Sequence, residues 1–277
     1  MKKYSKIVFI LAVSSDIGLF IAREYLRKGC RVVGTYRTKS AGVSALQAHP
    51  ACDLLRCDIT KPGSLSRCLD QYKALKAPWD IFISCVGDPR PVQAFFEADF
   101  NQWAESVEVN ALAQLRALHG LYPLRRAAAK THAVFFAGGG VNKPVKNFSA
   151  YTVSKLMLIK MCEYLDAENK DLNVFIIGPG WTKTKIHQVV LNDPHVPADK
   201  SRATVRFLKV ETGTPYQDIY DCIERFMKAG KTVASGRNFS VVHDPWKGDG
   251  GKELMMQLKR DPHLYKLRRH GSLQKER

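Results

Sequence analysis

Short apolar runs alternate with amphipathic stretches along most of this 277-residue chain. The runs have the length of buried strands, whereas the stretches carry apolar residues at helical spacing. The apolar runs cover residues 7–12, 31–35, 53–57, 81–85, 133–137, 173–177 and 239–242. The helix-length stretches cover residues 18–28, 64–75, 100–118 and 151–169. This alternation predicts an α/β fold, a Rossmann-like doubly wound parallel sheet with helices on both faces.

The length of the chain suits a single Rossmann-like domain over residues 1–277. We expect its core over about residues 1–245 and a basic C-terminal tail over about residues 246–277, which begins at a flexible glycine-rich joint and continues as a helix. Residues 182–213 break the alternation with polar, Pro-containing sequence, which is typical of a lid or a substrate loop. A further helix is predicted to begin near residues 214–215.

Seven cysteines, an odd number, are scattered without a Cys-x-x-Cys pair. This spacing argues against a disulfide framework and against a zinc site, so no metal is expected. Reduced thiols in the core predict a cytoplasmic protein. The N-terminal apolar run is brief and leads into a polar turn, which favours a first buried strand over a signal peptide. No run approaches the roughly 20 apolar residues of a membrane span.

The net charge of +17 is the outlying compositional feature. A basic surface suits anionic substrates, acidic membranes or nucleic acid, and it is also compatible with a merely solvated surface. The chain has no recognised DNA-binding motif, so no specific nucleic-acid partner is expected. A non-specific polyanion binder, with steep salt dependence, stays open as an alternative.

Tyr151 and Lys155 form the most informative pair of residues. Four residues apart on a helix, the two side chains lie on one face. There the ammonium group is expected to lower the phenol pKa from about 10 towards neutrality. A tyrosine so placed can act as a general acid or base.

The turn after the first predicted strand, residues 11–18, can present backbone N–H groups and a helix N-terminus to a pyrophosphate. Together with Tyr151 and Lys155, it resembles the short-chain dehydrogenase/reductase family, whose turn reads Thr-Gly-x-x-x-Gly-Ile-Gly. The positions that fit this pattern are Ser14, Ser15, Ile17 and Gly18. Ala12 and Asp16 replace two glycines, and the Asp16 carboxylate would repel a phosphate unless it turns away.

The resemblance continues in order along the chain. It implies that Asp58 and Ile59 hold the adenine, that Asn110 is catalytic, and that Thr184 meets the nicotinamide carboxamide. Its remaining cofactor-binding positions are Gly87, Pro179 and Gly180.

Tyr36 and Arg37, with Lys39 nearby, stand where an NAD enzyme has an acidic residue for the ribose 2′-hydroxyl. Cationic side chains there suit a 2′-phosphate. The sequence therefore predicts NADP(H) as the preferred cofactor, with NAD(H) possible.

The serine that the family uses to hydrogen-bond the substrate carbonyl is missing, because its place falls on Ala137 or Gly138. Loss of one such donor typically costs about 10²–10³ in rate. Asn142 and Lys143 are conceivable substitutes, and a hydroxyl restored at residue 137 or 138 is expected to raise turnover in a weakened reductase. A nucleotide-binding regulatory protein that has lost turnover is the alternative.

The resemblance implies an oxidoreductase that transfers hydride between a nicotinamide and a carbonyl or secondary alcohol. Tyr151 would transfer the proton, Lys155 would hold the nicotinamide ribose, and Asn110 would order a water beside the lysine. A homodimer or homotetramer would form through residues 100–118 and 151–169. A polar substrate, sugar-like or anionic, is expected from the side chains at the mouth of the irregular loop: Trp181, Lys183, Lys185 and His187.

Overall fold

The computed structural model describes residues 4–127, 130–210 and 212–268. Within these residues, seven strands form one sheet in the order β3-β2-β1-β4-β5-β6-β7, and every neighbouring pair is parallel. The strands are β1 Ile7–Leu11, β2 Arg31–Tyr36, β3 Cys52–Arg56, β4 Ile81–Ser84, β5 Thr131–Phe136, β6 Leu172–Gly178 and β7 Asn238–Ser240. The predicted doubly wound sheet is confirmed.

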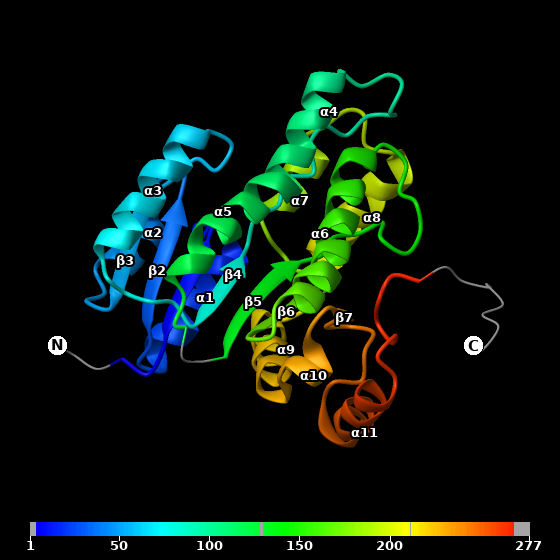
Figure 1. Ribbon diagram of the computed structural model, residues 1–277. Helices are drawn as coiled ribbons and strands as arrows, with labels where there is room; N and C mark the ends of the chain where they lie inside the picture. Colours follow the sequence, from blue (N-terminus) through cyan, green and yellow to red (C-terminus); the bar gives the residue numbers. More distant parts are fainter. Residues whose placement is uncertain (1–3, 128–129, 211, 269–277) are drawn as a thin grey trace.

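Helices cover both faces of the sheet (Figure 1). Along β1, Val8 and Ile10 point to one face, whereas Phe9 and Leu11 point to the other. The first face is covered by α1 Asp16–Arg27, α2 Ala41–Gln47, α9 Tyr216–Ala229, α10 Lys231–Ala234 and α11 Gly248–Arg260. The second is covered by α3 Pro62–Ala74, α5 Ala113–Leu121 and α6 Ser149–Glu168. Burial on both faces explains why the strands are continuously apolar.

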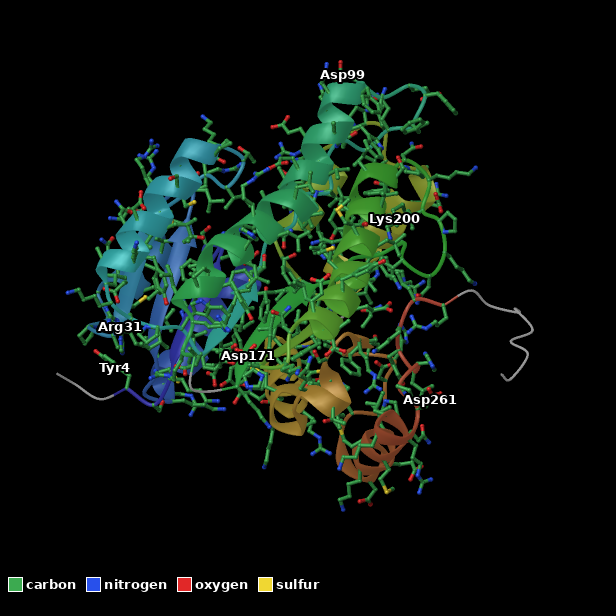
Figure 2. All side chains as sticks on the ribbon, in the orientation of Figure 1. Tyr4, Arg31, Asp99, Asp171, Lys200 and Asp261 are labelled. Atoms are coloured by element: carbon green, nitrogen blue, oxygen red, sulfur yellow. The ribbon has the colours of Figure 1, made fainter. Side chains whose placement is uncertain are left out.

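The stretch predicted as one helix over residues 100–118 is a helix in three parts. Helix α4 Phe100–Val107 leads through a π-helical turn, Glu108–Leu112, into α5. Asp99 caps α4, since its Oδ1 accepts a hydrogen bond from the backbone N–H of Gln102 at 2.9 Å, and Figure 2 shows Asp99 at the free end of this helix. Single π-helical turns of this kind occur often at functional sites.

Residues 182–210 are here called the lid. The sequence predicted an irregular loop for this segment, but the structure is largely helical. The lid contains α7 Ile186–Leu191 and α8 Ala198–Val210. Val190 of α7 packs against Val92 and Phe148, which follow β4 and β5. These apolar contacts stabilise a helix whose sequence alone shows little periodicity.

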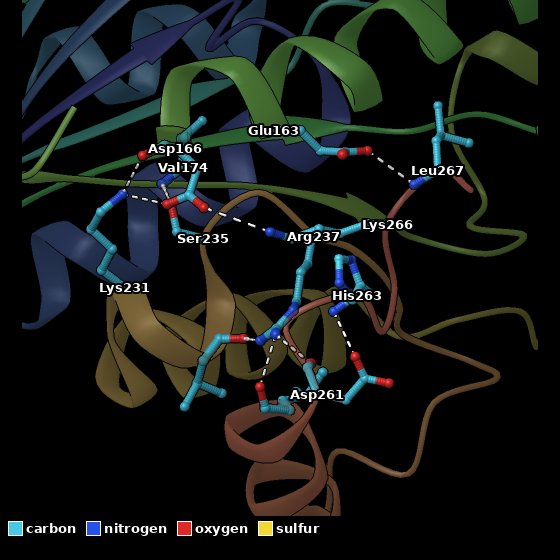
Figure 3. A network of polar contacts seen from close by, with 12 residues as sticks. Glu163, Asp166, Val174, Lys231, Ser235, Arg237, Asp261, His263, Lys266 and Leu267 are labelled. Carbon is cyan, nitrogen blue, oxygen red and sulfur yellow. Dashed lines mark hydrogen bonds and ion pairs between the residues drawn. The ribbon is translucent and has the colours of Figure 1, made fainter. Parts of the chain in front are cut away.

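The C-terminal segment packs on β7 rather than extending from a flexible joint. Helix α11 begins inside the glycine-rich stretch, and Trp246, Leu254 and Leu258 are buried in the core, which therefore extends past residue 245. Figure 3 shows the Arg237 guanidinium inserted at the end of α11, where it donates to the carbonyls of Leu258 at 2.8 Å and Asp261 at 2.9 Å. Residues 269–277 of the predicted tail lie outside the described residues.

Among the residues described, none of the helices has both the length and the apolar character needed to cross a membrane.

Candidate active site

The predicted site residues gather along one edge of the sheet. They follow the carboxyl ends of parallel strands, and the chain order reverses between the neighbouring strands β1 and β4. Such a reversal leaves a crevice in which ligands of doubly wound folds bind.

The turn between β1 and α1 is built for close approach of a ligand to the backbone. Ser15 caps α1, because its Oγ accepts from the N–H of Gly18 at 3.0 Å. A Cβ on Gly18 would lie 2.8 Å from the carbonyl oxygen of Ala12, so only glycine fits there. Ala12 itself adopts φ +58°, a conformation that glycine normally provides. Ser14 and Ile17 are partly exposed beside the helix N-terminus.

A cavity of about 270 Å³ lies next to this turn. It is lined by Ser14, Arg37, Thr38, Lys39, Ser40 and Lys185. Three cationic side chains and three hydroxyls therefore surround a space that suits a phosphate group. Tyr36 ends β2 directly before this cluster and is partly buried.

Asp58 and Ile59 follow β3 on the same edge. Asp58 Oδ1 accepts hydrogen bonds from the backbone N–H of Thr60 at 3.2 Å and from its hydroxyl at 2.8 Å. Ile59 is partly buried and packs against the core. The Asp58 carboxylate thus stabilises the turn that follows β3.

Tyr151 and Lys155 lie in the first half of α6, as the sequence predicted. The Lys155 Nζ is 5.5 Å from the centroid of the Tyr151 ring and donates to the carbonyl of Val86 at 3.0 Å. Gly87, the next residue, is exposed, and a Cβ on it would lie 4.0 Å from the Tyr151 hydroxyl.

The pKa values of this pair differ from the expectation. Burial, with the nearby Asp88 carboxylate, raises the pKa of Tyr151 to about 12. Burial also lowers the pKa of Lys155 to about 7. The expected drop of the phenol pKa is wrong for this structure, because burial and the Asp88 carboxylate both raise the pKa of Tyr151.

Asn110 lies in the π-helical turn and is fully buried. Its Oδ1 accepts from the N–H of Asp88 at 2.9 Å, and its Nδ2 donates to the carbonyl of Asp88 at 2.7 Å. The Asn110 carbonyl accepts from Gln114 Nε2 at 2.7 Å, and Ser84 Oγ donates to Gln114 Oε1 at 2.6 Å. In this structure Asn110 fixes the loop after β4.

A side chain at residue 138, one of the two positions expected for the missing serine, would overlap Tyr151. A Cβ on Gly138 would lie 2.6 Å from the phenol oxygen and 2.7 Å from Cζ of the ring. Ala137 is buried in the core cluster on one face of the sheet, whereas Asn142 and Lys143 are exposed. The geometry therefore explains why residue 138 is glycine.

The sequence reading missed Asp88 and Arg90. The Arg90 Nε and Nη2 donate to the two oxygens of Asp88 at 2.9 Å and 2.5 Å. Burial opposes ionisation of Asp88, but the bonds from Arg90 outweigh it and lower its pKa. A Gly-Asp-Pro-Arg sequence directly after a strand was the signal that could have identified this pair beside Tyr151.

The residues expected at the mouth of the lid separate into two groups. Trp181 stacks on His187, with ring centroids 5.9 Å apart, and both pack against Phe207 of α8. Lys183 Nζ donates to the carbonyl of Leu208 at 3.0 Å, whereas Lys185 lines the phosphate-sized cavity.

Pro179, Gly180 and Thr184 follow β6. Gly180 has φ +74°, and a Cβ on it would lie 2.6 Å from Thr214 Oγ1. The Thr184 carbonyl accepts from the His187 N–H at 3.2 Å and so begins the turn into α7.

A larger cavity of about 1110 Å³ lies between α8, α9 and the end of β7. Its lining includes Trp181, Arg206, Phe207 and Trp246, but neither Tyr151 nor Lys155. This cavity is therefore separate from the Tyr151–Lys155 pair.

Comparison with known proteins agrees with this geometry. The model of the short chain dehydrogenase family matches residues 6–194. An "Uncharacterized oxidoreductase" of Bacillus subtilis is 23% identical over 185 residues, covering 64% of this chain and 70% of that protein. Another of Saccharomyces cerevisiae is 30% identical over 149 residues, covering 50% and 57%. The 11-beta-hydroxysteroid dehydrogenase A of Sesamum indicum is 23% identical over 189 residues, covering 66% and 54%.

Most of these relatives are matched over less than two thirds of their own length. Among solved structures, a short-chain dehydrogenase/reductase of Saccharomyces cerevisiae has a TM-score of 0.78 at 19% identity, covering 88% of this chain and 99% of that one. A 4-hydroxyisoleucine dehydrogenase complexed with NADH has a TM-score of 0.71 at 19% identity, covering 85% and 96%. These structures share the fold. The family match over residues 6–194 shows that this chain belongs to the short-chain dehydrogenase family.

Proposed function

We propose that this protein is an NADP(H)-dependent oxidoreductase that transfers hydride between a nicotinamide and a carbonyl or secondary alcohol. The observation that carries the proposal is the cationic cavity formed by Arg37, Lys39 and Lys185 beside the β1 turn, on the same sheet edge as Tyr151 and Lys155.

The residues at this edge fit a dinucleotide. The Ser14–Gly18 turn and the N-terminus of α1 suit the pyrophosphate, because a helix N-terminus attracts an anion. Arg37 and Lys39 suit a 2′-phosphate, while Asp58 and Ile59 flank the adenine side. Lys155, Pro179, Gly180 and Thr184 would hold the nicotinamide half.

The chemistry needs a hydride and a proton. A dihydronicotinamide held beside Lys155 would supply the hydride for the carbonyl carbon and would be oxidised in return. The Tyr151 hydroxyl donates its proton to the carbonyl oxygen, which becomes the alcohol. Burial raises the pKa of Tyr151 to about 12, so its phenol carries the proton at neutral pH but is a weaker acid than an ordinary tyrosine.

The proposed substrate is polar, sugar-like or anionic. Support comes from the Arg90–Asp88 ion pair, which lies beside Tyr151 and is partly exposed. An anionic group on the substrate can share the Arg90 guanidinium.

The proposed assembly is a homodimer or homotetramer in the cytoplasm. The outer surfaces of α4, the π-helical turn and α6 expose large apolar residues, namely Phe100, Leu112, Val153 and Tyr164. Contiguous exposed apolar surface often marks a protein–protein interface. A cytoplasmic location is supported by the free thiols of all seven cysteines, which lie in the described residues.

Cofactor titration tests the proposal. Arg37→Gln is expected to weaken NADPH binding by about tenfold, because a charge-assisted hydrogen bond to the 2′-phosphate is lost, while NADH binding stays unchanged. Nicotinamide fluorescence gives both dissociation constants, and Arg23→Gln on the exposed side of α1 is the matched control. Equal affinity for both cofactors in the unmodified protein would refute the NADP(H) assignment.

A second candidate function is nucleotide-dependent regulation without turnover. It is favoured by the absence of a donor at Gly138 and by the high pKa of Tyr151. Tight NADPH binding with no oxidation of NADPH by a panel of ketones and nucleotide-linked sugars would support it. Turnover that Tyr151→Phe abolishes, with cofactor binding retained, would support the oxidoreductase.

A further inference from the structure

Lys185 belongs to the lid, yet its side chain lines the same cavity as Arg37 and Lys39. These residues come from opposite ends of the segment matched to the family, and the fold brings them together at one sheet edge. A side chain of the lid therefore faces the space in which a phosphate of the cofactor is proposed to bind.

Asp16 determines where Lys185 lies. The Lys185 backbone N–H donates to Asp16 Oδ2 at 2.8 Å, and the Lys185 Nζ is 3.5 Å from Asp16 Oδ1. Asp16 is the first residue of α1, where a carboxylate is favoured by the helix dipole. The carboxylate that the sequence suggested would repel a phosphate is thus directed to the lid.

The neighbouring Lys183 of the lid does not line the cavity that Lys185 lines. Its Nζ donates to the Leu208 carbonyl at 3.0 Å, within the lid itself. Lys183 and Lys185 are separated by one residue and carry the same charge, but only Lys185 reaches the cavity.

We propose that Lys185 is a third cationic ligand of the cofactor 2′-phosphate, positioned by Asp16, so that a cofactor with this phosphate fastens the lid to the crevice. A 2′-phosphate carries up to two negative charges near neutral pH and can accept from several cations at once. NADH lacks this group and would leave the Lys185 ammonium paired with Asp16 only. The inference rests on the proposed function and adds a link between cofactor identity and lid closure.

The binding test compares Lys185→Gln with Lys183→Gln. Lys185→Gln is expected to weaken NADPH binding by about five- to tenfold and to leave NADH binding within about twofold, because one charge-assisted contact is lost. It should also reduce the salt dependence of NADPH binding, since exposed charges are screened by salt. Lys183→Gln is expected to change neither dissociation constant.

Hydrogen–deuterium exchange of α7 provides a readout independent of activity. NADPH is expected to protect residues 186–191 more than NADH does, and Lys185→Gln should abolish this difference. In the cofactor-free protein, Asp16→Ala should speed exchange of the Lys185 amide, because that N–H loses its acceptor.

The outcomes separate the two proposals. If Arg37→Gln lowers NADPH affinity while Lys185→Gln leaves affinity and lid protection unchanged, the role of Lys185 is refuted and the proposed cofactor stands. Equal losses in Lys185→Gln and Lys183→Gln would indicate general electrostatic attraction and also refute it. No effect of either Arg37→Gln or Lys185→Gln would refute the NADP(H) assignment itself.

Discussion

The Tyr151 ring occupies the space that a side chain at residue 138 would need. Because a Cβ on Gly138 would lie 2.6 Å from the phenol oxygen, any side chain there must displace the ring. Gly138→Ser and Gly138→Ala are both expected to lose about 1–3 kcal/mol of stability and most turnover. Urea unfolding and kcat measure these effects. The expected loss replaces the earlier expectation that a hydroxyl at residue 138 raises turnover. A Gly138→Ser variant faster than the unmodified protein, with an inactive Gly138→Ala variant, would restore the earlier expectation.

Lys155 makes the stability of the cofactor-free protein depend on pH. Its pKa falls from 10.5 to about 7 on burial, so between these values the unfolded chain binds more protons than the folded one. Stability should therefore rise with pH in this window, by about 1 kcal/mol per unit between pH 7.5 and 8.5.

Lys155→Met is expected to remove this contribution, and Lys160→Met on the exposed side of α6 to retain it. Urea unfolding of the three proteins is measured at pH 6.5, 7.5 and 8.5. The cysteines are the same in all three, so a difference in pH dependence comes from the substituted lysine. Parallel curves for Lys155→Met and the unmodified protein would show that Lys155 keeps its ordinary pKa.

At the scale of elements, the buried Arg237 adds polar contacts to the apolar packing that holds the C-terminal segment on β7. Arg237 is 3% exposed, and its guanidinium donates to carbonyls of Val233, Leu258 and Asp261. Arg237→Met leaves these acceptors without their donor and is expected to cost about 2–4 kcal/mol. Arg260→Met, exposed on α11, is the control for removal of one charge. Denaturant unfolding with a loss as small in Arg237→Met as in the control would contradict this role.

The elements show what sequence can and cannot predict here. Every strand was predicted within a few residues, because burial on both faces gives continuous apolar runs between amphipathic helices. Helix α7 was missed, since its stability comes from Val190 packing on Val92 and Phe148 rather than from its own periodicity. The glycines of 248–251 suggested a joint, but buried Trp246 and Leu254 anchor α11 from both sides.

The sequence also predicted some features of the candidate site and not others. The order of motifs placed Tyr151, Lys155 and the β1 turn at one sheet edge, because carboxyl ends of parallel strands share an edge. The sequence could not show that the surroundings of Tyr151 raise its pKa, nor that Asp16 turns to the lid. Both depend on contacts between segments far apart in the chain.

At the scale of the whole molecule, α4 and α6 present the apolar surface through which we expect two copies to pair, and Figure 1 shows both helices on the near face. Val153 is 44% exposed there. In a two-fold symmetric interface each substitution occurs twice, so Val153→Glu buries two like charges.

Sedimentation velocity should find the unmodified protein as a dimer or tetramer, and Val153→Glu as a smaller species. Val210→Glu at the 76% exposed end of α8 should leave the mass unchanged. A monomeric unmodified protein would refute the assembly, and an equal shift in both variants would mean that the added charge, rather than the α4–α6 face, controls association.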